Sequence, residues 1–102
     1  MSPMGDFSIH ALDDVIHGRI RLGVMAYLVG AQTADFNALK THLATTDGNL
    51  SVHLRKLEEA GYVTIDKSFR GRKPVTAVSL TASGREAFSQ YLGALAGLIG
   101  KG

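Results

Sequence analysis

The segment TTDGNLSVHLRKLEEAGYV, residues 45–63, carries side chains suited to close contact with a polar partner. Leucines recur in it at helical spacing and mark the inward face of a helix: Leu50, Leu54 and Leu57. The start and outer face of this helix supply the candidate contact residues: Thr46, Gly48, Asn49, Ser51, Val52, Arg55 and Lys56. Their amide, hydroxyl and guanidinium groups can donate to base edges or phosphates, a valine methyl can touch a thymine methyl, and glycine admits a close backbone approach. Each of these residues taken alone can equally be ordinary exposed surface.

A basic cluster follows the leucine-rich helix. Six of the eleven Lys and Arg residues lie between positions 55 and 73: Arg55, Lys56, Lys67, Arg70, Arg72 and Lys73. The alternating segments YVTIDKSF and VTAVSL flank the turn RGRKP, which predicts a β-hairpin over about 63–80. The tip of this hairpin carries Arg70, Arg72 and Lys73, which suit a minor groove or its phosphates. A solvated basic turn is the alternative interpretation.

The histidines are the remaining candidates for metal or acid–base chemistry: His10, His17, His42 and His53. None pairs with a second ligand at the spacing of a zinc site, and the chain contains no cysteine. No nucleophile, base and orienting acid assemble in one short stretch, and no glycine-rich phosphate loop follows a predicted strand. We therefore expect no enzymatic activity, no metal and no cofactor. His53, beside the leucine stripe, is interpreted as a packed or phosphate-contacting residue.

Two helices are predicted before the segment that opens this section. Apolar residues at three- and four-residue steps predict a helix over about 11–29, which His17 and Gly18 can divide in two. The stretch GAQTAD then reads as a polar linker. Asn37 is a good N-cap for a short helix ALKTHLA, whose leucines face inward.

The next helix is predicted over about 47–60. Thr46 can cap its exposed amides, Asp47 suits its positive start, and Gly61 ends it. Only a few residues separate it from the preceding helix, so the two helices are joined by a tight turn.

A last helix is predicted over about 82–99. Its start is either Thr81 or a capping box formed by Ser83 and Glu86. One apolar stripe runs along it: Phe88, Tyr91, Leu92, Leu95, Leu98 and Ile99. Because so long a stripe exceeds what a small core can cover, we expect it to form a homodimer interface. The spacing of small residues in GALAG permits close helix packing there.

Composition bounds the organisation of the chain. With 102 residues and 45 % apolar content, it suits one domain, expected over 11–99 after a flexible leader at 1–10. The absence of cysteine fits a reducing compartment, and no apolar run approaches the length of a membrane span. We therefore expect a cytoplasmic protein with no membrane partner. The net charge of only +2 makes the distribution of charges more informative than their sum.

The element order is that of a winged helix-turn-helix domain, an α+β, mainly α fold with a β-hairpin wing and a C-terminal dimerisation helix. At GNLSVHLRKLEEAGYV and DKSFRGRKPVTAVSLTASGREAF the sequence resembles MarR/ArsR-type winged-helix transcriptional regulators, particularly small stand-alone ones. The motifs are S-x-H-L-x-x-L-E-x-A-G-Y-V at the helix exit and L-T-x-x-G-R at the start of the last helix. The resemblance covers roughly residues 12–95. It does not extend to the cysteine-rich motifs of the ArsR-like metal sensors.

The resemblance implies a transcriptional regulator that binds double-stranded DNA as a homodimer. The helix at 47–60 would then be the recognition helix in the major groove, and the wing would lie at the adjacent minor groove or backbone. A winged-helix module that binds a protein or RNA partner is the alternative, because RNA phosphates attract the same cations. A small-molecule sensor is a further alternative, although no polar cluster in the sequence defines an effector.

Overall fold

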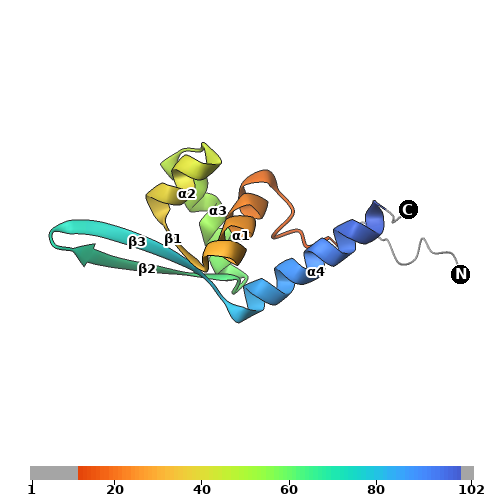
Figure 1. Cartoon of the computed structure of the whole chain (residues 1–102). Helices are drawn as coiled ribbons and strands as arrows, with labels where there is room; N and C mark the ends of the chain where they lie inside the picture. Colours follow the sequence, from red (N-terminus) through yellow and green to blue (C-terminus); the bar gives the residue numbers. More distant parts are fainter. Residues whose placement is uncertain (1–11, 100–102) are drawn as a thin grey trace, which may run out of the picture.

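The computed structural model describes residues 12–99, so the predicted leader at 1–10 and its His10 lie outside the described residues. The elements, in chain order, are α1 (Arg19–Ala31), β1 (Thr33–Asp35), α2 (Phe36–Leu43), α3 (Asp47–Glu59), β2 (Val63–Arg70), β3 (Lys73–Leu80) and α4 (Ala82–Leu98). Helices α1, α2 and α3 form a compact body from which the β2–β3 hairpin and α4 extend in opposite directions (Figure 1). The predicted α+β winged helix-turn-helix fold is confirmed. No helix among residues 12–99 is long and apolar enough to cross a membrane.

The first helix begins at Arg19, directly after the predicted division at His17 and Gly18, and residues 12–18 form turns in place of the predicted first part of the helix. Asp13 causes the difference, because its side chain accepts the amide of Val15 at 2.8 Å while its carbonyl accepts the amide of His17 at 2.7 Å. An aspartate that captures nearby backbone amides stabilises a turn in competition with a helix. The turn is held against α4, since His17 Nδ1 lies 2.8 Å from the Tyr91 hydroxyl.

The predicted linker GAQTAD contains a strand. In β1, Thr33 pairs with Ser79 and Asp35 with Ala77, and Ala34 between them is buried. The predicted N-cap of α2 is also wrong, because Asp35 caps this helix and accepts the amide of Asn37 at 2.9 Å. Asp35 thus ends a strand and starts a helix, which leaves no room for a linker.

The sheet is antiparallel with strand order β1-β3-β2. Its central strand, β3, pairs with β2 along its whole length and with β1 only between Ala77 and Ser79. Pro74 faces Phe69 of β2, and on its other side no strand of the described chain pairs with it. A proline is tolerated at such an edge because no ladder partner there requires its N–H.

The core lies between the three body helices and the base of the sheet. The inward leucines of α3 are confirmed, because Leu50, Leu54 and Leu57 are all buried. Thr81 is the N-cap of α4, and its hydroxyl accepts the amide of Gly84 at 2.9 Å, so the first of the two predicted caps is the one observed. Gly84 lies so close to the sheet that a Cβ there would come within 2.2 Å of the Tyr62 carbonyl oxygen.

Candidate nucleic-acid interface

The start of α3 is held by three local contacts. Thr46 is the N-cap, as predicted, and its hydroxyl accepts the amide of Asn49 at 3.1 Å. The Asn49 side-chain amide donates to the Thr45 hydroxyl at 2.8 Å, and Asp47 forms an ion pair with Lys40 of α2 at 2.7 Å. The first two contacts order the start of α3, and the third links α2 to α3 and neutralises the carboxylate nearest that start.

The outer face of α3 is open to solvent. All seven residues predicted to make contacts there are exposed: Thr46, Gly48, Asn49, Ser51, Val52, Arg55 and Lys56. Val52 keeps 54 % of its surface exposed in the middle of this polar face. A Cβ at Gly48 would meet no atom within 4 Å, so the packing of this chain does not require glycine at that position. The position of this face is therefore as predicted, while its binding role stays a prediction.

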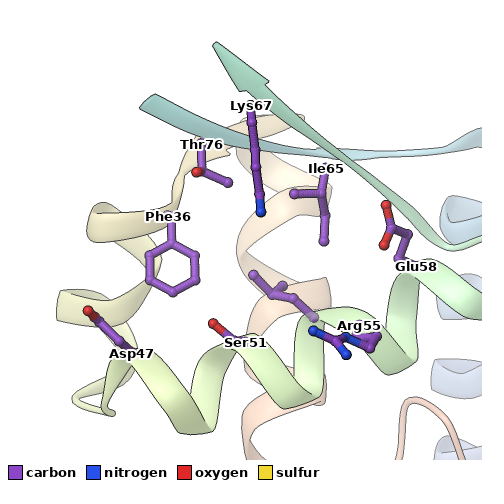
Figure 2. A pocket seen from close by; sticks show the side chains of 9 residues that line it. Phe36, Asp47, Ser51, Arg55, Glu58, Ile65, Lys67 and Thr76 are labelled. Carbon is purple, nitrogen blue, oxygen red and sulfur yellow. The ribbon is translucent and has the colours of Figure 1, made fainter. Parts of the chain in front are cut away.

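A groove of about 660 Å³ separates α3 from the wing, which comprises β2, β3 and their turn. Figure 2 shows Lys67 reaching into it from β2 toward the α3 side, where Ser51 and Arg55 lie. Thr76 of β3 and Phe36 of α2 complete the wall, and the carboxylates of Asp47 and Glu58 lie toward its two ends. The middle of the groove therefore presents hydroxyl, ammonium and guanidinium donors.

Lys67 was not among the predicted contact residues, although it belongs to the basic cluster. The signal that places it is strand alternation, because Val63, Ile65 and Lys67 share one face of β2. Val63 is buried, which fixes that face toward the body of the domain. The charge of Lys67 is thereby brought into the groove that faces α3.

The wing tip is a two-residue turn, Gly71–Arg72, closed by the cross-strand pair of Arg70 and Lys73. Gly71 has φ +66°, a conformation that a side chain would strain, as in hairpin turns that start with glycine. Arg70, Arg72 and Lys73 are all exposed. Within residues 12–99 the ion pair found is that of Lys40 with Asp47, so none of the tip cations is neutralised by a described carboxylate.

His53 anchors α3 to α1. Its Nδ1 lies 2.8 Å from Nη1 of Arg21, whose Nε donates to the Val15 carbonyl at 2.5 Å. Burial lowers the pKa of His53, and the positive charges of Arg21 and Lys56 lower it further. The neutral imidazole is therefore favoured and accepts the guanidinium hydrogen bond. Among residues 12–99 no three His, Cys, Asp or Glu side chains gather into a group that could hold a metal ion.

The apolar stripe of α4 divides into two parts. Phe88 and Tyr91 are buried in the core of this chain, and their rings stack with centroids 6.3 Å apart. Beyond them, Leu92 is 47 % and Ile99 79 % exposed, and Leu95 and Leu98 are half-buried. The part of the stripe available to a partner is therefore the second half of α4.

Comparison with known proteins agrees with this architecture. Residues 20–99 match the family described as winged helix DNA-binding domain. A transcriptional regulator homologue from Pyrococcus horikoshii OT3 superposes with a TM-score of 0.81 at 31 % identity, covering 97 % of this chain and 95 % of that one. An uncharacterized protein of Methanocaldococcus jannaschii is 40 % identical over 78 residues, which are 76 % of this chain and 85 % of that protein.

Two larger proteins share the fold at lower identity. NadR, solved in complex with 4-hydroxyphenylacetate, matches with a TM-score of 0.69 at 22 % identity over 92 % of this chain and 65 % of its own. Overoxidized AbfR bound to DNA matches with a TM-score of 0.66 at 21 % identity over 74 % of this chain and 54 % of its own. These two likenesses establish the fold alone.

Proposed function

Because the chain belongs to the winged helix DNA-binding domain family and resembles a transcriptional regulator homologue over nearly its whole length, we propose that it is a sequence-specific transcriptional regulator. It binds double-stranded DNA in the cytoplasm as a homodimer, without enzymatic activity. The observation that carries the proposal is the groove shared by α3 and the wing, whose central donors come from both elements. The description of AbfR as bound to DNA supports the same use of the fold.

In the proposed complex, the outer face of α3 enters the major groove. A B-DNA major groove is about 12 Å wide and admits one α-helix. Asn49 and Arg55 then donate to base edges, and Val52 meets a thymine methyl group. Thr46, Ser51 and Lys56 lie at the borders of this face and contact phosphates, while Gly48 lets the start of the helix come close.

The groove between α3 and the wing receives the sugar–phosphate strand that separates the major groove from the adjacent minor groove. Lys67 of the wing and Ser51 of α3 donate to its phosphates from opposite sides of the groove. Glu58 repels phosphates at its end of the groove, whereas Lys40 neutralises Asp47 at the other end, so the strand is favoured away from Glu58. Arg70, Arg72 and Lys73 then reach the minor groove or its far backbone.

The homodimer is formed by the exposed half of α4. Helix α4 projects from the body of the domain (Figure 1), and its second half carries the exposed Leu92, the half-buried Leu95 and Leu98 and, just after its end, the exposed Ile99. A second copy can cover this stripe by two-fold symmetry. A dimer presents two α3 helices to two half-sites, which adds specificity that a single small interface cannot provide. Sedimentation is expected to show a dimer at micromolar concentration and a monomer for Leu92→Glu. A wild-type monomer would refute this part of the proposal.

Selection of bound fragments from a random duplex library tests the function directly. Enrichment of a two-fold symmetric sequence is expected. The alternative, a protein- or RNA-binding module, predicts no enriched duplex, and it also predicts that an RNA hairpin matched in sequence binds at least as well as the duplex.

A triple alanine variant at Asn49, Val52 and Arg55 is expected to fold and to lose preference for the selected sequence over a scrambled one. The matched control is Leu54→Ala, which removes a buried contact and should lower stability by about 2–5 kcal/mol. Its binding should fall only in proportion to the unfolded fraction. A folded triple variant that keeps the original preference would contradict the assignment of α3.

A further inference from the structure

Phe69 is a large apolar residue near the end of the wing, outside the hydrophobic core of the described chain and the residues packed against it. The residue is 72 % exposed, and it precedes a turn whose side chains are cationic. Across the hairpin it pairs with Pro74, which is also exposed. These two residues form an apolar patch of the wing that the fold of this chain does not use.

Strand alternation places this patch on the binding side of the wing. Phe69 lies on the same face of β2 as Ile65 and Lys67, and Pro74 on the same face of β3 as Thr76. Ile65, Lys67 and Thr76 line the groove with α3. The patch is therefore a direct continuation of that groove toward the tip.

The cations near the apolar patch indicate which kind of partner it can bind. Strand alternation places Arg70 and Lys73 on the opposite face of the hairpin tip, Arg72 lies in the turn between them, and none of the three is paired with a carboxylate of the described chain. A partner must therefore be anionic and yet offer apolar surface. The minor groove of DNA meets both conditions, because its phosphates line a cleft walled by deoxyribose and floored by base edges.

The distance between Lys67 and Phe69 along β2 agrees with the proposed DNA binding, and the inference about Phe69 rests on that proposed function. Two residues of an antiparallel strand advance by about 7 Å, so Phe69 lies about that far beyond Lys67. When Lys67 contacts the phosphate strand in the groove, Phe69 is carried past that strand into the minor groove, which is about 6 Å wide. We infer that Phe69, backed by Pro74, is an apolar wedge that the wing inserts in the minor groove beside each half-site.

A wedge of this kind gives specificity without hydrogen bonds to bases. Apolar side chains that enter the minor groove unstack a base step, and pyrimidine–purine steps such as TpA open most easily. The wing should therefore favour a TpA step at one fixed distance from the bases that α3 contacts. Phe69 is a specificity-determining residue in this scheme, and Arg70, Arg72 and Lys73 supply attraction that is independent of sequence.

The test uses the full chain and the duplex selected from the random library. In a series of duplexes, one TpA step is moved through the positions that flank each half-site, and 2-aminopurine replaces the adenine of that step. The wild-type chain is expected to bind about fivefold or more tightly when TpA occupies one particular flanking position, and to raise the fluorescence there. Phe69→Ala should abolish both effects, while Phe69→Leu retains most of them.

Two controls distinguish the loss of the Phe69 ring from a loss of charge and from unfolding. Because Phe69 is uncharged, Phe69→Ala should leave the salt dependence of binding unchanged. Because its ring is exposed, the thermal midpoint should also change little. If the alanine variant does not fold, Phe69→Thr removes the ring and keeps a β-branched residue in the strand.

The experiment distinguishes failure of the proposed DNA binding from failure of the wedge alone. A wild-type chain that binds no duplex overturns the proposed function together with the wedge. A chain that binds duplex, but shows the same flanking preference with or without the ring of Phe69, overturns only the wedge. An equal loss of affinity for every duplex in the series also overturns it, since that result assigns Phe69 to the backbone.

Discussion

Removing the three cations of the wing tip gives the most quantitative test of the interface. Arg70, Arg72 and Lys73 are exposed, and no described carboxylate neutralises them, so each is free to meet a phosphate and release a counterion. Each neutralised phosphate contributes about 0.9 to the slope of log affinity against log salt. Three such contacts therefore contribute about 2.7 to this slope for each wing and about 5 for the two wings of a dimer.

The assay is fluorescence anisotropy on a labelled duplex between 50 and 200 mM salt. Substituting alanine at all three positions should flatten the slope by up to these amounts. It should weaken binding to selected and scrambled duplexes about equally, because phosphates carry no sequence information. Far-UV circular dichroism and the thermal midpoint should stay near those of the wild type, since no tip side chain is buried.

The matched control changes the side chains and keeps the charges. A variant with Arg70→Lys, Arg72→Lys and Lys73→Arg should keep nearly the wild-type slope. If the alanine variant shows an unchanged slope and unchanged affinity at 50 mM salt, the wing tip does not touch the DNA. If it loses preference for the selected sequence as well, the tip reads bases and the assignment to phosphates is wrong.

Three other substitutions test the site and its support. Arg55→Ala should cost about 1–3 kcal/mol and relax preference at one base position per half-site, whereas an equal loss on all duplexes would assign this guanidinium to phosphate. Gly84→Ala should lower the free energy of unfolding by about 1–3 kcal/mol, because its Cβ would lie 2.2 Å from the Tyr62 carbonyl oxygen. The control Gly30→Ala in α1, with open space around it and outside the proposed dimer interface, should raise stability by about 1 kcal/mol in denaturant melts. The hydrogen bond to Asp13 raises the pKa of Tyr62 to about 12, so its stabilising effect should be complete below pH 10.0 and be lost as pH rises toward 12. The Tyr62→Phe variant should be less stable than the wild type below pH 10.0, and its stability should fall less between pH 10.0 and 12 because it has no phenol to ionise. Identical profiles of stability against pH for the two proteins would refute the role of this hydrogen bond.

The sequence predicted the elements that depend on strong periodicity. Leucine spacing located α3 and its buried face, and alternation located the hairpin with its basic tip. Thr46 and Thr81 were recognisable as caps because each immediately precedes a periodic segment and is followed by amides that need an acceptor. The same periodicity placed the candidate contact residues on the outer face of α3.

The sequence did not predict the features that depend on contacts between distant segments. β1 is three residues long, too short to show alternation, and it exists because β3 offers a partner. Asp35 and Asn37 are both competent caps two residues apart, so the strand pairing decides between them. The turn at Asp13 depends on Tyr62, whose hydroxyl donates to the Asp13 carboxylate from 49 residues away.

The candidate site shows the same division. The sequence could identify donors on α3 and cations on the tip, because exposure there follows from local pattern. It could not identify the groove, since the role of Lys67 depends on how the wing packs over Ser51 and Arg55. The exposure of Phe69 could not be predicted from the sequence either, because an aromatic residue in a strand is more often buried than exposed.

A hydrogen-bonded joint at the base of the wing links DNA contact to assembly. The Thr81 amide donates to the Tyr62 carbonyl at 3.1 Å, and its hydroxyl donates to the Gly61 carbonyl at 2.7 Å. Gln32, at the end of α1, exchanges two hydrogen bonds of 2.9 Å with Leu80. The end of α3, the end of β3 and the start of α4 are therefore held in one orientation.

This joint has a consequence for the proposed dimer. If α4 holds two copies together, the angle that the joint imposes between α3 and α4 sets the distance between the two α3 helices. Two half-sites read from one side of the duplex lie about 34 Å apart, or one helical turn. Gly84 belongs to the same joint, because its missing side chain lets α4 start against the Tyr62 carbonyl. A larger residue there would tilt α4, so the effect on DNA binding should exceed the loss of stability and depend on half-site spacing.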